Sequence, residues 1–450
     1  MAYSFDPNAL SEFARYYGFH YDRIDPINLM EDVVVEMDRG LRGLDSSLLM
    51  IPAYINPVIN VEPGKTVIAL DAGGTNLRSA LIKFDKNGKP VVGESLKAFM
   101  PGTQGRLGAD AFFDRIADVT APLIEKSSEP IEGIGFCFSY SMDITKDADG
   151  ILIYFSKEVD APEVLGKAIG QGLREALARR KVKAPERIVL LNDTAATLLS
   201  GLSEIPVQNS RFNADDKNAV SASPMIGMIL GTGFNTAYPE TRIPKIGFNS
   251  PDNPQIVVCE SGNFAHRYMG ALDREYDKTT NSPGAYTLEK ATAGAYLGPL
   301  TLHFLKQAIN DGLLRFKKSD EFLALPTMQT RDLDSFSQTM EGPIAEFFAK
   351  DEKEAAAGLM YISSIVTERG AMLSAAVAAG AVERVSAGYD PFAPARIAVE
   401  GTTFVAYKGM RRALESWLHI MLNKGKPRSY IIAPVGQASL FGAAVAALSK

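Results

Sequence analysis

Short apolar runs separated by polar turns dominate residues 64–100 and predict a small antiparallel sheet. The runs lie at 67–70, 77–84 and 91–99, and each has a length typical of a strand. The sequence DKNG at 85–88 is a strong hairpin signal, and a glycine pair occupies the preceding turn. We therefore expect a three-stranded antiparallel meander.

Helical and strand patterns alternate after this meander. A second strand, 225–230, leads into another glycine turn and a further strand, which suggests an internal duplication. We expect two α/β lobes with helical additions, and a solvated loop at 203–224. The other predicted strands are 131–139 and 188–191, and the predicted helices are 110–125 and 161–180, with more helix within 1–60, 285–310, 340–382 and 403–423.

Composition fits a globular protein and excludes several classes. The chain has 450 residues, of which 46% are hydrophobic and 22% charged, which leaves little room for a disordered, collagenous or coiled-coil chain. Because a single core stops growing at about 250–300 residues, we expect more than one domain. The net charge of −6 argues against a broad nucleic-acid surface. The basic cluster at 179–183 ends a predicted helix, where cations are favoured, and is interpreted as solvated.

Cysteines, histidines and apolar runs bear on metals and location. Cys137 and Cys259 are too few for a disulfide scaffold, and the four histidines stand far apart with no zinc-site spacing. The longest uncharged apolar run, 371–382, is shorter than the about 18 residues of a membrane span. The first residues lack a basic region and an apolar stretch of signal type. We expect a cytoplasmic protein that binds neither membranes nor nucleic acid.

The first glycine turn, DAGGTN at 71–76, offers phosphate-binding chemistry. Gly73 and Gly74 let the backbone approach a phosphate, and Asp71 ends a buried strand, where a carboxylate needs a partner such as a metal ion or its waters. An ordinary glycine hairpin is the alternative, since a strand follows and neither the dinucleotide fingerprint nor the P-loop is present. The second turn, GTGFN at 231–235, favours function, because two such turns could clamp a polyphosphate.

Other candidate side chains have both a functional and a structural interpretation. Asn192 and Asp193 lie at a strand-to-helix junction, where they could cap the helix or place a general base in a cleft. Glu260 follows four apolar residues and needs a partner if buried, whereas Glu289 could simply complement a helix dipole. Lys157 follows an apolar run, although a lone lysine is usually a surface residue.

Together and in this order, the motifs resemble those of the hexokinase family of ATP-dependent sugar kinases. VIALDAGGTNLR at 67–78 is similar to its first phosphate motif and IGMILGTGFNTAY at 226–238 to its second. GFCFSYS at 135–141 and YFSKEVDAPEVLGKAI at 154–169 resemble its sugar-binding segments. The remaining matches are LLNDTAATL at 190–198, VVCESGNF at 257–264, LEKATAGAYLG at 288–298, VEGTTFVAYKG at 399–409 and GQASLFGAAVAAL at 436–448.

The resemblance implies an α/β fold with two lobes, of the actin-like (ribonuclease H-like) type, and a sugar cleft between them. The small lobe would comprise residues 64–193 plus 436–450, and the large lobe residues 1–63 plus 194–435. The predicted meander and the repeated glycine turn agree with this fold independently.

The resemblance also implies roles for individual residues. Asp193 would accept the proton of the sugar 6-hydroxyl as it attacks the γ-phosphate of ATP, and Lys157 would stabilise charge on the phosphoryl group. Asp71 would position Mg²⁺ through its waters. The sugar would be held by Ser139, Ser156, Lys157, Asn192, Asp193, Asn235, Glu260 and Glu289. The nucleotide would be bound by Asp71, Gly73, Gly74, Thr75, Asn76, Arg78, Thr232, Gly233, Gly401, Thr402 and Ser439.

The implied activity is phosphorylation of a hexose, glucose first, by ATP with Mg²⁺, in a monomer or homodimer. The alternatives are a kinase for a different hexose or an amino sugar, and a non-catalytic hexose sensor on the same fold. Retention of both Asp193 and Lys157 argues against the sensor. Three departures bear on sugar preference and nucleotide affinity: Phe155-Ser156 stand where the family usually has Trp-Thr, Ser261 where it has Trp, and Ala438-Ser439-Leu440 where it has Gly-Ser-Gly.

Overall fold

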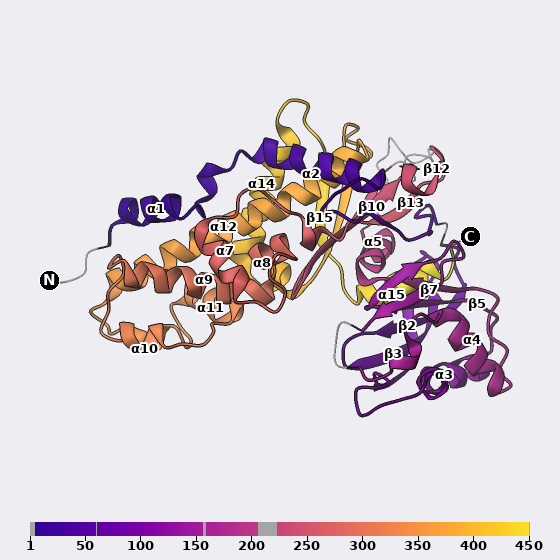
Figure 1. Ribbon diagram of the computed structural model, residues 1–450. Coiled ribbons are helices and arrows are strands. Elements are labelled where there is room, and N and C mark those ends of the chain that lie inside the picture. The colour runs from indigo at the N-terminus through magenta and orange to yellow at the C-terminus, as the bar shows by residue number, and fades with distance from the viewer. Residues whose placement is uncertain (1–4, 60, 156–158, 206–222, 450) are drawn as a thin grey trace.

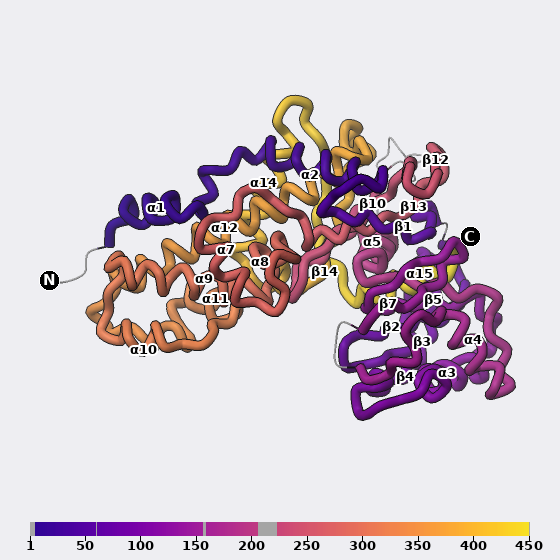
Figure 2. Tube along the Cα trace, in the orientation of Figure 1, coloured from indigo at the N-terminus to yellow at the C-terminus, as the bar shows by residue number. Residues whose placement is uncertain are grey.

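The computed structural model describes residues 5–59, 61–155, 159–205 and 223–449, which form two lobes (Figure 1). The chain begins in the large lobe, builds the small lobe and then returns to the large one (Figure 2). Its last helix ends on the small lobe, beside strands formed much earlier. The predicted α/β, two-lobed class is confirmed.

The small lobe is built on a five-stranded sheet of order β4-β3-β2-β5-β8. β3 pairs antiparallel with both β2 and β4, which confirms the predicted meander, whereas β5 runs parallel to β2 and β8. The strands are β2 (Thr66–Ala72), β3 (Asn76–Phe84), β4 (Pro90–Phe99), β5 (Ile131–Phe138) and β8 (Ile188–Leu191).

Helices α3 (Ala109–Lys126) and α4 (Ile169–Arg179) pack against this sheet and against each other. The helix predicted over 161–180 is wrong in its first part: a 3-10 turn occupies Pro162–Val164, and Gly166 adopts a φ of 75° that no α-helix continues through. The hairpin of β6 (Ser141–Ile144) and β7 (Gly150–Tyr154) was not predicted.

The basic cluster at the end of α4 has a structural role that its interpretation as solvated missed. Arg179 and Arg180 both reach Asp114 of α3, at 2.9 and 2.7 Å, and Arg180 also pairs with Asp118 at 2.7 Å. The cluster therefore joins α4 to α3 by ion pairs at the surface.

The large lobe is built on a six-stranded sheet of order β1-β13-β10-β9-β14-β15. β10 is antiparallel to β9 and β13, whereas β14 is parallel to β9 and β15. The strands are β1 (Ile51–Pro52), β9 (Met225–Leu230), β10 (Phe234–Glu240), β13 (Gln255–Val258), β14 (Ala395–Glu400) and β15 (Tyr430–Pro434), and the pair β11 (Arg242–Ile243) and β12 (Phe248–Asn249) forms a separate hairpin.

The two sheets repeat one topology. The order β4-β3-β2-β5-β8 corresponds strand by strand to β13-β10-β9-β14-β15, with two antiparallel pairs followed by two parallel ones. In both sheets a glycine turn joins the central strand to its antiparallel neighbour. The structure thus contains the repeat that the two glycine turns suggested.

Helices α5 (Asp193–Glu204) and α15 (Ala438–Ala446) pack together between the two sheets. α5 lies on β9 and β14, and α15 lies on β2 and β5. The close approach of α5 and α15 requires glycine, because a Cβ at Gly442 would lie 2.0 Å from the carbonyl oxygen of Ala196. The approach of β5 to α15 requires it too, because a Cβ at Gly135 would lie only 1.7 Å from the carbonyl oxygen of Ala443. One hydrophobic cluster, which includes Val67, Leu198 and Ala443, therefore joins both lobes.

The rest of the large lobe is helical and covers the other face of its sheet. The long helix α12 (Lys353–Arg384) has the length and apolar character of a membrane span, but 94% of its most apolar window is buried inside the protein, as in a core helix. The region 340–382, expected to be mostly helical, is so: a 3-10 turn at Ala345–Phe347 precedes α12, which begins at Lys353. The other helices are α1 (Pro7–Tyr16), α2 (Pro26–Leu41), α7 (Ala271–Lys278), α8 (Thr287–Thr292), α9 (Gly294–Asn310), α10 (Ser319–Leu323), α11 (Thr330–Thr339), α13 (Thr402–Ala406) and α14 (Lys408–Asn423).

Candidate active site

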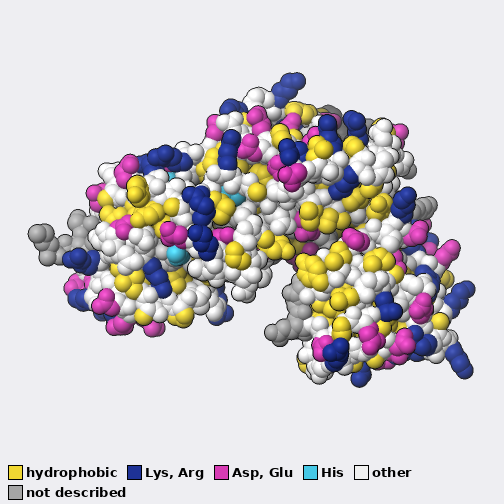
Figure 3. Space-filling model, in the orientation of Figure 1, with side chains coloured by type: hydrophobic (Ala, Val, Ile, Leu, Met, Phe, Trp, Pro, Cys, Tyr) yellow, Lys and Arg dark blue, Asp and Glu magenta, His cyan; other side chains and the backbone are white. Residues whose placement is uncertain are grey.

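A cavity of about 530 Å³ lies between the two lobes, and the space-filling view shows the molecule hollowed between them (Figure 3). The ends of β5, β8, β10 and β13 and the β6–β7 hairpin contribute to its walls. Seven residues predicted to bind sugar or nucleotide line it, namely Ser139, Asn192, Asp193, Gly233, Asn235, Glu260 and Glu289. These residues are far apart in the sequence, so the fold brings them together.

Asp193 is the first residue of α5, directly after the buried strand β8. Asn192 caps the helix, because its side-chain oxygen accepts a hydrogen bond from the Ala195 N–H at 2.8 Å. Thr197 holds the same turn by donating to the Asp193 carbonyl at 2.9 Å. The capping interpretation thus holds for Asn192, while Asp193 lines the cavity from a rigid helix terminus.

Asn235 organises the acids of the large lobe. Its side-chain nitrogen donates to Glu260 at 3.0 Å, and its side-chain oxygen accepts from the Ser261 N–H at 3.1 Å. Glu260 does not continue its strand: it adopts a left-handed conformation with φ of 55°, which turns the chain at the cavity wall. Glu289 accepts a hydrogen bond from the Phe234 N–H at 3.0 Å. Both carboxylates are therefore already oriented.

Burial raises the pKa of both Glu260 and Glu289, the nearby Asp193 adds to the shift of both, and Glu289 adds to that of Glu260. Carboxylates that are held close together and out of water gain from hydroxyl donors, because each hydrogen bond offsets part of the lost hydration. The site therefore suits a ligand with several adjacent hydroxyl groups.

The first glycine turn is an open hairpin. The Gly73 N–H donates to the Asn76 carbonyl at 3.0 Å, while Thr75 and Asn76 are exposed. Tyr140, beside the predicted sugar segment, donates from its hydroxyl to the Gly73 carbonyl at 2.8 Å. The hairpin therefore presents polar groups to solvent and is tied to the cavity by one side chain.

Arg78 and Asp71 stand opposite each other in the β2–β3 pair. Arg78 donates to the side chain of Gln437, at the start of α15, at 2.9 Å. Ser439, also predicted to bind nucleotide, lies in the first turn of α15. The Arg78–Gln437 contact therefore connects the first glycine turn to the last helix of the chain.

The second glycine turn is closed by packing. Thr403 and the Gly294 N–H both donate to the Gly231 carbonyl, at 2.8 and 2.7 Å. Gly401 has a φ of 125°, and a Cβ there would lie 2.4 Å from the Leu230 carbonyl oxygen. Thr232 and Thr402 line a separate cavity of about 490 Å³ beside the termini of α9 and α13.

Comparison with known proteins identifies the family of the chain. The hexokinase family models match residues 10–202 and 225–449. The chain belongs to the hexokinase family. It is 28% identical to the potato (Solanum tuberosum) protein named Hexokinase-2, over 93% of this chain and 86% of the relative, and 27% identical to rice Hexokinase-2, over 92% and 86%.

Solved structures agree on the fold. A Schistosoma mansoni hexokinase complexed with glucose superimposes with a TM-score of 0.71 at 20% identity, over 99% of this chain and 100% of the other. A second crystal structure of a hexokinase gives a TM-score of 0.77 at 21% identity, over 98% and 99%. This hexokinase is accordingly a two-lobed sugar phosphotransferase.

Two residues predicted for catalysis or sugar binding in this hexokinase, Ser156 and Lys157, lie outside the described residues. Among the described residues, no three His, Cys, Asp or Glu side chains gather closely enough to hold a metal ion by themselves. Mg²⁺ needs no such cluster, because it commonly uses one or two carboxylates, waters and substrate phosphates. Asp71 at a strand end beside the phosphate hairpin fits that mode of binding.

The sequence analysis did not single out Glu400, which is the last residue of β14, a strand that packs against α5. Its carboxylate accepts a hydrogen bond from Thr197 at 3.2 Å, and burial raises its pKa to about 7, with Asp193 and Asp71 adding to the shift. The signal was available, since Glu400 follows an apolar run just as Glu260 does.

Two tyrosines of the cavity wall, Tyr154 and Tyr286, were also missed. Tyr154 begins the segment 154–169 that resembles a sugar-binding motif but was not itself singled out, and Tyr286 precedes the motif at 288–298, so the fold was needed to place both on the cavity wall.

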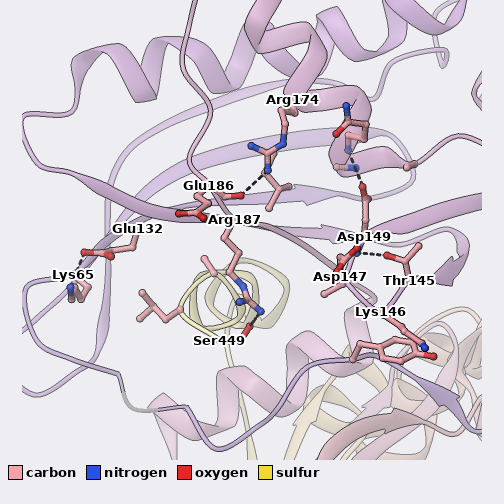
Figure 4. Close-up of a pocket in the computed structure, with 18 of the residues that line it drawn as sticks. Lys65, Glu132, Thr145, Lys146, Asp147, Asp149, Arg174, Glu186, Arg187 and Ser449 are labelled. Carbon is pink, nitrogen blue, oxygen red and sulfur yellow. Dashed lines mark hydrogen bonds and ion pairs between the residues drawn. The ribbon is translucent and has the colours of Figure 1, made fainter. Parts of the chain in front are cut away.

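A larger cavity, of about 1090 Å³, lies on the small lobe of this hexokinase, away from the predicted site residues that the structure describes (Figure 4). Its charged groups have partners within the protein: Lys65 pairs with Glu132 at 2.8 Å, and Asp149 accepts from the Gly170 and Gln171 N–H groups at the start of α4. Arg187 donates to Ser449 at 3.1 Å. Its size alone does not make it the active site.

Proposed function

We propose that this hexokinase transfers the γ-phosphoryl group of ATP to the 6-hydroxyl of a hexose, with glucose as the preferred acceptor. The observation that carries the proposal is the convergence of Asp193, Asn235, Glu260 and Glu289 on one cavity between the lobes. The glucose bound to the Schistosoma mansoni hexokinase supports the choice of sugar.

In the proposed reaction, Asp193 accepts the proton of the 6-hydroxyl as the oxygen attacks the phosphoryl group. Its place at the first turn of α5 fixes the carboxylate, so that positioning supplies much of the rate. Glu260 and Glu289 accept hydrogen bonds from other sugar hydroxyls, and Asn235 keeps Glu260 in place. Lys157 keeps its predicted role of stabilising charge on the transferred group, on the strength of its motif.

The nucleotide would lie between the two glycine turns. On the small lobe, the phosphates would be bound by Thr75, Asn76 and Arg78. Gly73 and Gly74 would let the backbone come close to the phosphates. Thr232, Gly233, Gly401 and Thr402 would bind from the large lobe, beside the 490 Å³ cavity. Mg²⁺, held through Asp71, would supply neutralisation of phosphate charge. Ser439, in α15, would bind the nucleotide from the side of the small lobe.

We also propose that the lobes correspond to the predicted division, 64–193 plus 436–450 and 1–63 plus 194–435. The packing of α15 on β2 and β5 supports the assignment of the last segment to the small lobe. Closure of such lobes excludes water, which otherwise competes with the sugar as phosphoryl acceptor. A cytoplasmic location and a monomeric or homodimeric state are parts of the same proposal.

The test is phosphorylation of a panel of hexoses by the purified protein with Mg²⁺ and ATP, followed by both ADP release and sugar 6-phosphate. Asp193→Asn keeps the shape of the side chain and should lower kcat by about 10³-fold or more, while calorimetry still detects glucose binding. ADP release without a phosphorylated sugar would overturn the proposal. Glucose binding with no turnover in the unaltered protein would indicate the sensor, and a preferred amino sugar would indicate the alternative kinase.

A further inference from the structure

Asn263 lies on the wall of the cavity between the lobes, three residues after Glu260, in the short 3-10 turn Ser261–Asn263. Its backbone N–H donates to the Glu260 carbonyl at 3.1 Å, which closes the turn. The motif at 257–264 contains both residues, but only Glu260 was assigned to the sugar. The structure shows that this turn holds both residues on the wall of the same cavity.

The oxygen and the nitrogen of the Asn263 side chain have different surroundings. The oxygen accepts a hydrogen bond from the Tyr286 N–H at 3.4 Å, directly before the helix α8 that carries Glu289. The Thr287 hydroxyl adds a second link between the two segments by donating to the Phe264 carbonyl at 2.9 Å. Within the part of the chain that the structure describes, the side-chain nitrogen of Asn263 donates to no protein group, and the residue is half-buried. Both N–H groups are therefore left for a ligand.

The chemistry of the cavity calls for such a donor beside its acids. An ionised carboxylate only accepts hydrogen bonds, whereas a sugar hydroxyl is one donor with two acceptor lone pairs. A hydroxyl that donates to Glu260 still has free lone pairs, and out of water these cost free energy unless a donor reaches them. Asn235 already uses its side-chain nitrogen to donate to Glu260 at 3.0 Å. Asn263 supplies uncharged N–H donors from the turn that begins at Glu260.

We propose that Asn263 is a specificity-determining residue of the sugar site, whose side-chain N–H groups donate to the hydroxyl that itself donates to Glu260. The inference rests on the proposed function, because the cavity is the one assigned to the hexose. The paired contact selects a group that both donates and accepts, as a hydroxyl does. An ammonium group has three donors and no acceptor, so Asn263 disfavours an amino group at that ring position. A sugar that lacks this hydroxyl leaves Asn263 and Glu260 without their shared partner.

The contact contributes to sugar affinity rather than to the chemical step. Asn263 touches the sugar at a hydroxyl that does not react, so the contact is the same before and during phosphoryl transfer. Interactions of this kind lower KM without raising kcat. Loss of the contact should therefore raise Kd and KM for glucose and leave kcat within about twofold.

Calorimetric Kd values for glucose and for its 1-, 2-, 3- and 4-deoxy analogues, measured without ATP, test the assignment. Asn263→Ala should weaken glucose binding about threefold to tenfold, the range for one lost neutral hydrogen bond. One analogue lacks the hydroxyl that Asn263 binds, so the variant should bind it within about twofold as well as the unaltered protein does. Each other analogue should lose the same factor as glucose, because its contact with Asn263 is intact in the unaltered protein.

Asn263→Asp separates the donor from the link to α8. This variant keeps an oxygen for the Tyr286 N–H but replaces the amide nitrogen with a carboxylate oxygen near Glu260. Glucose binding should weaken by about tenfold or more, because the hydroxyl then meets two acceptors and no donor. The amino sugar with its ammonium group at the identified position should gain affinity relative to glucose. Asn8→Ala and Asn8→Asp, at an exposed position of α1, are the matched controls and should change nothing.

Three results would overturn the inference. Equal losses of affinity for glucose and for every deoxy analogue in Asn263→Ala would show that Asn263 acts only by holding Tyr286. An unchanged glucose Kd in either variant, or a fall in kcat at constant KM, would also contradict it. Unaltered protein that binds glucose without phosphorylating it would overturn the proposed function alone, since the Kd values test Asn263 without turnover. Unaltered protein that binds no glucose would overturn both.

Discussion

The two glycine turns occupy equivalent places in two sheets of the same topology, yet they are built differently. The first, between β2 and β3, is open: a Cβ at Gly73 would lie 3.9 Å from its nearest neighbour, the Asn76 carbonyl oxygen. The second, between β9 and β10, is enclosed by α9 and α13, and a Cβ at Gly233 would lie 2.9 Å from Glu289. The repeated scaffold therefore supports one exposed turn with open space around it and one turn that is enclosed by packing and lies beside the cavity.

The difference extends to the charged groups around each turn. Asp71 and Arg78 flank the first turn, and Arg78 is engaged with Gln437. The second turn has the acids Glu289 and Glu400 nearby, both with raised pKa values caused first by burial. The first turn therefore carries charged groups near exposed polar residues, while the second has buried acids beside it.

The largest loss of stability should come from adding one methyl group at Gly401, beside the enclosed second turn. Gly401→Ala would place a Cβ 2.4 Å from the Leu230 carbonyl at a φ of 125°. Overpacking and backbone strain together should lower the free energy of unfolding by about 4 kcal/mol, measured by urea denaturation. Gly73→Ala, in the open turn, is the matched control and should cost less than about 1 kcal/mol. Equal losses in the two variants would show that the two turns do not differ in packing.

The second prediction concerns the effect on kcat of changing Asp71, beside the exposed first turn. Asp71→Asn keeps the size of the side chain but removes its charge, so Mg²⁺ with ATP should be positioned poorly. We expect kcat to fall about a hundredfold or more, with the Kd for glucose unchanged, because Asp71 does not line the cavity that contains the predicted sugar contacts. Steady-state kinetics over a range of Mg²⁺ concentrations checks this. A weakened glucose Kd with normal kcat would place Asp71 in the sugar site instead.

A third prediction uses the pKa of Glu400, which is about 7 in the folded protein against an ordinary value of 4.5. Because the folded-state pKa is raised, the unfolded chain loses this proton first as the pH rises. The ligand-free protein should therefore be most stable below about pH 4.5 as far as this group is concerned, and should lose about 3 kcal/mol by pH 8. Glu400→Gln cannot ionise, so unfolding curves of the variant should lack this loss. Parallel pH profiles for the two proteins would contradict the assignment.

The sequence predicted the parts of this fold that depend on local pattern. The meander of β2, β3 and β4 follows from strand-length apolar runs and turn residues, and the family resemblance follows from the order of motifs such as DAGGTN and GTGFN. The β6–β7 hairpin was missed because its strands are short and its turn, at 145–149, contains no glycine before Gly150. The start of α4 was misplaced because helix formers precede Gly166.

Long-range features needed the structure. Asp193 and Glu260 could be named from motifs, but the hydrogen bond between Glu260 and Asn235 of another strand could not. The motifs at 154–169 and 288–298 did not single out Tyr154 and Tyr286, and only the fold places both residues on the wall of one cavity. Glu400 had the signal of a carboxylate after an apolar strand, although burial near Asp193 is a property of the tertiary fold.

The smallest predicted effect tests the hydrogen bond by which Tyr140 ties the open turn to the cavity. Tyr140 is 5% exposed, and burial raises its pKa to about 12, so its hydroxyl stays protonated and donates to the Gly73 carbonyl. Tyr140→Phe removes this hydrogen bond and should lower stability by about 1 kcal/mol. Because the open turn then moves more freely, KM for ATP should rise about twofold to fivefold, the equivalent of that loss, while KM for glucose stays constant. Tyr16→Phe, at a position that is 83% exposed on α1, serves as the control. A change in KM for glucose without one for ATP would mean that Tyr140 acts on the sugar wall rather than on the phosphate turn, and the two halves would then be less independent than their packing indicates.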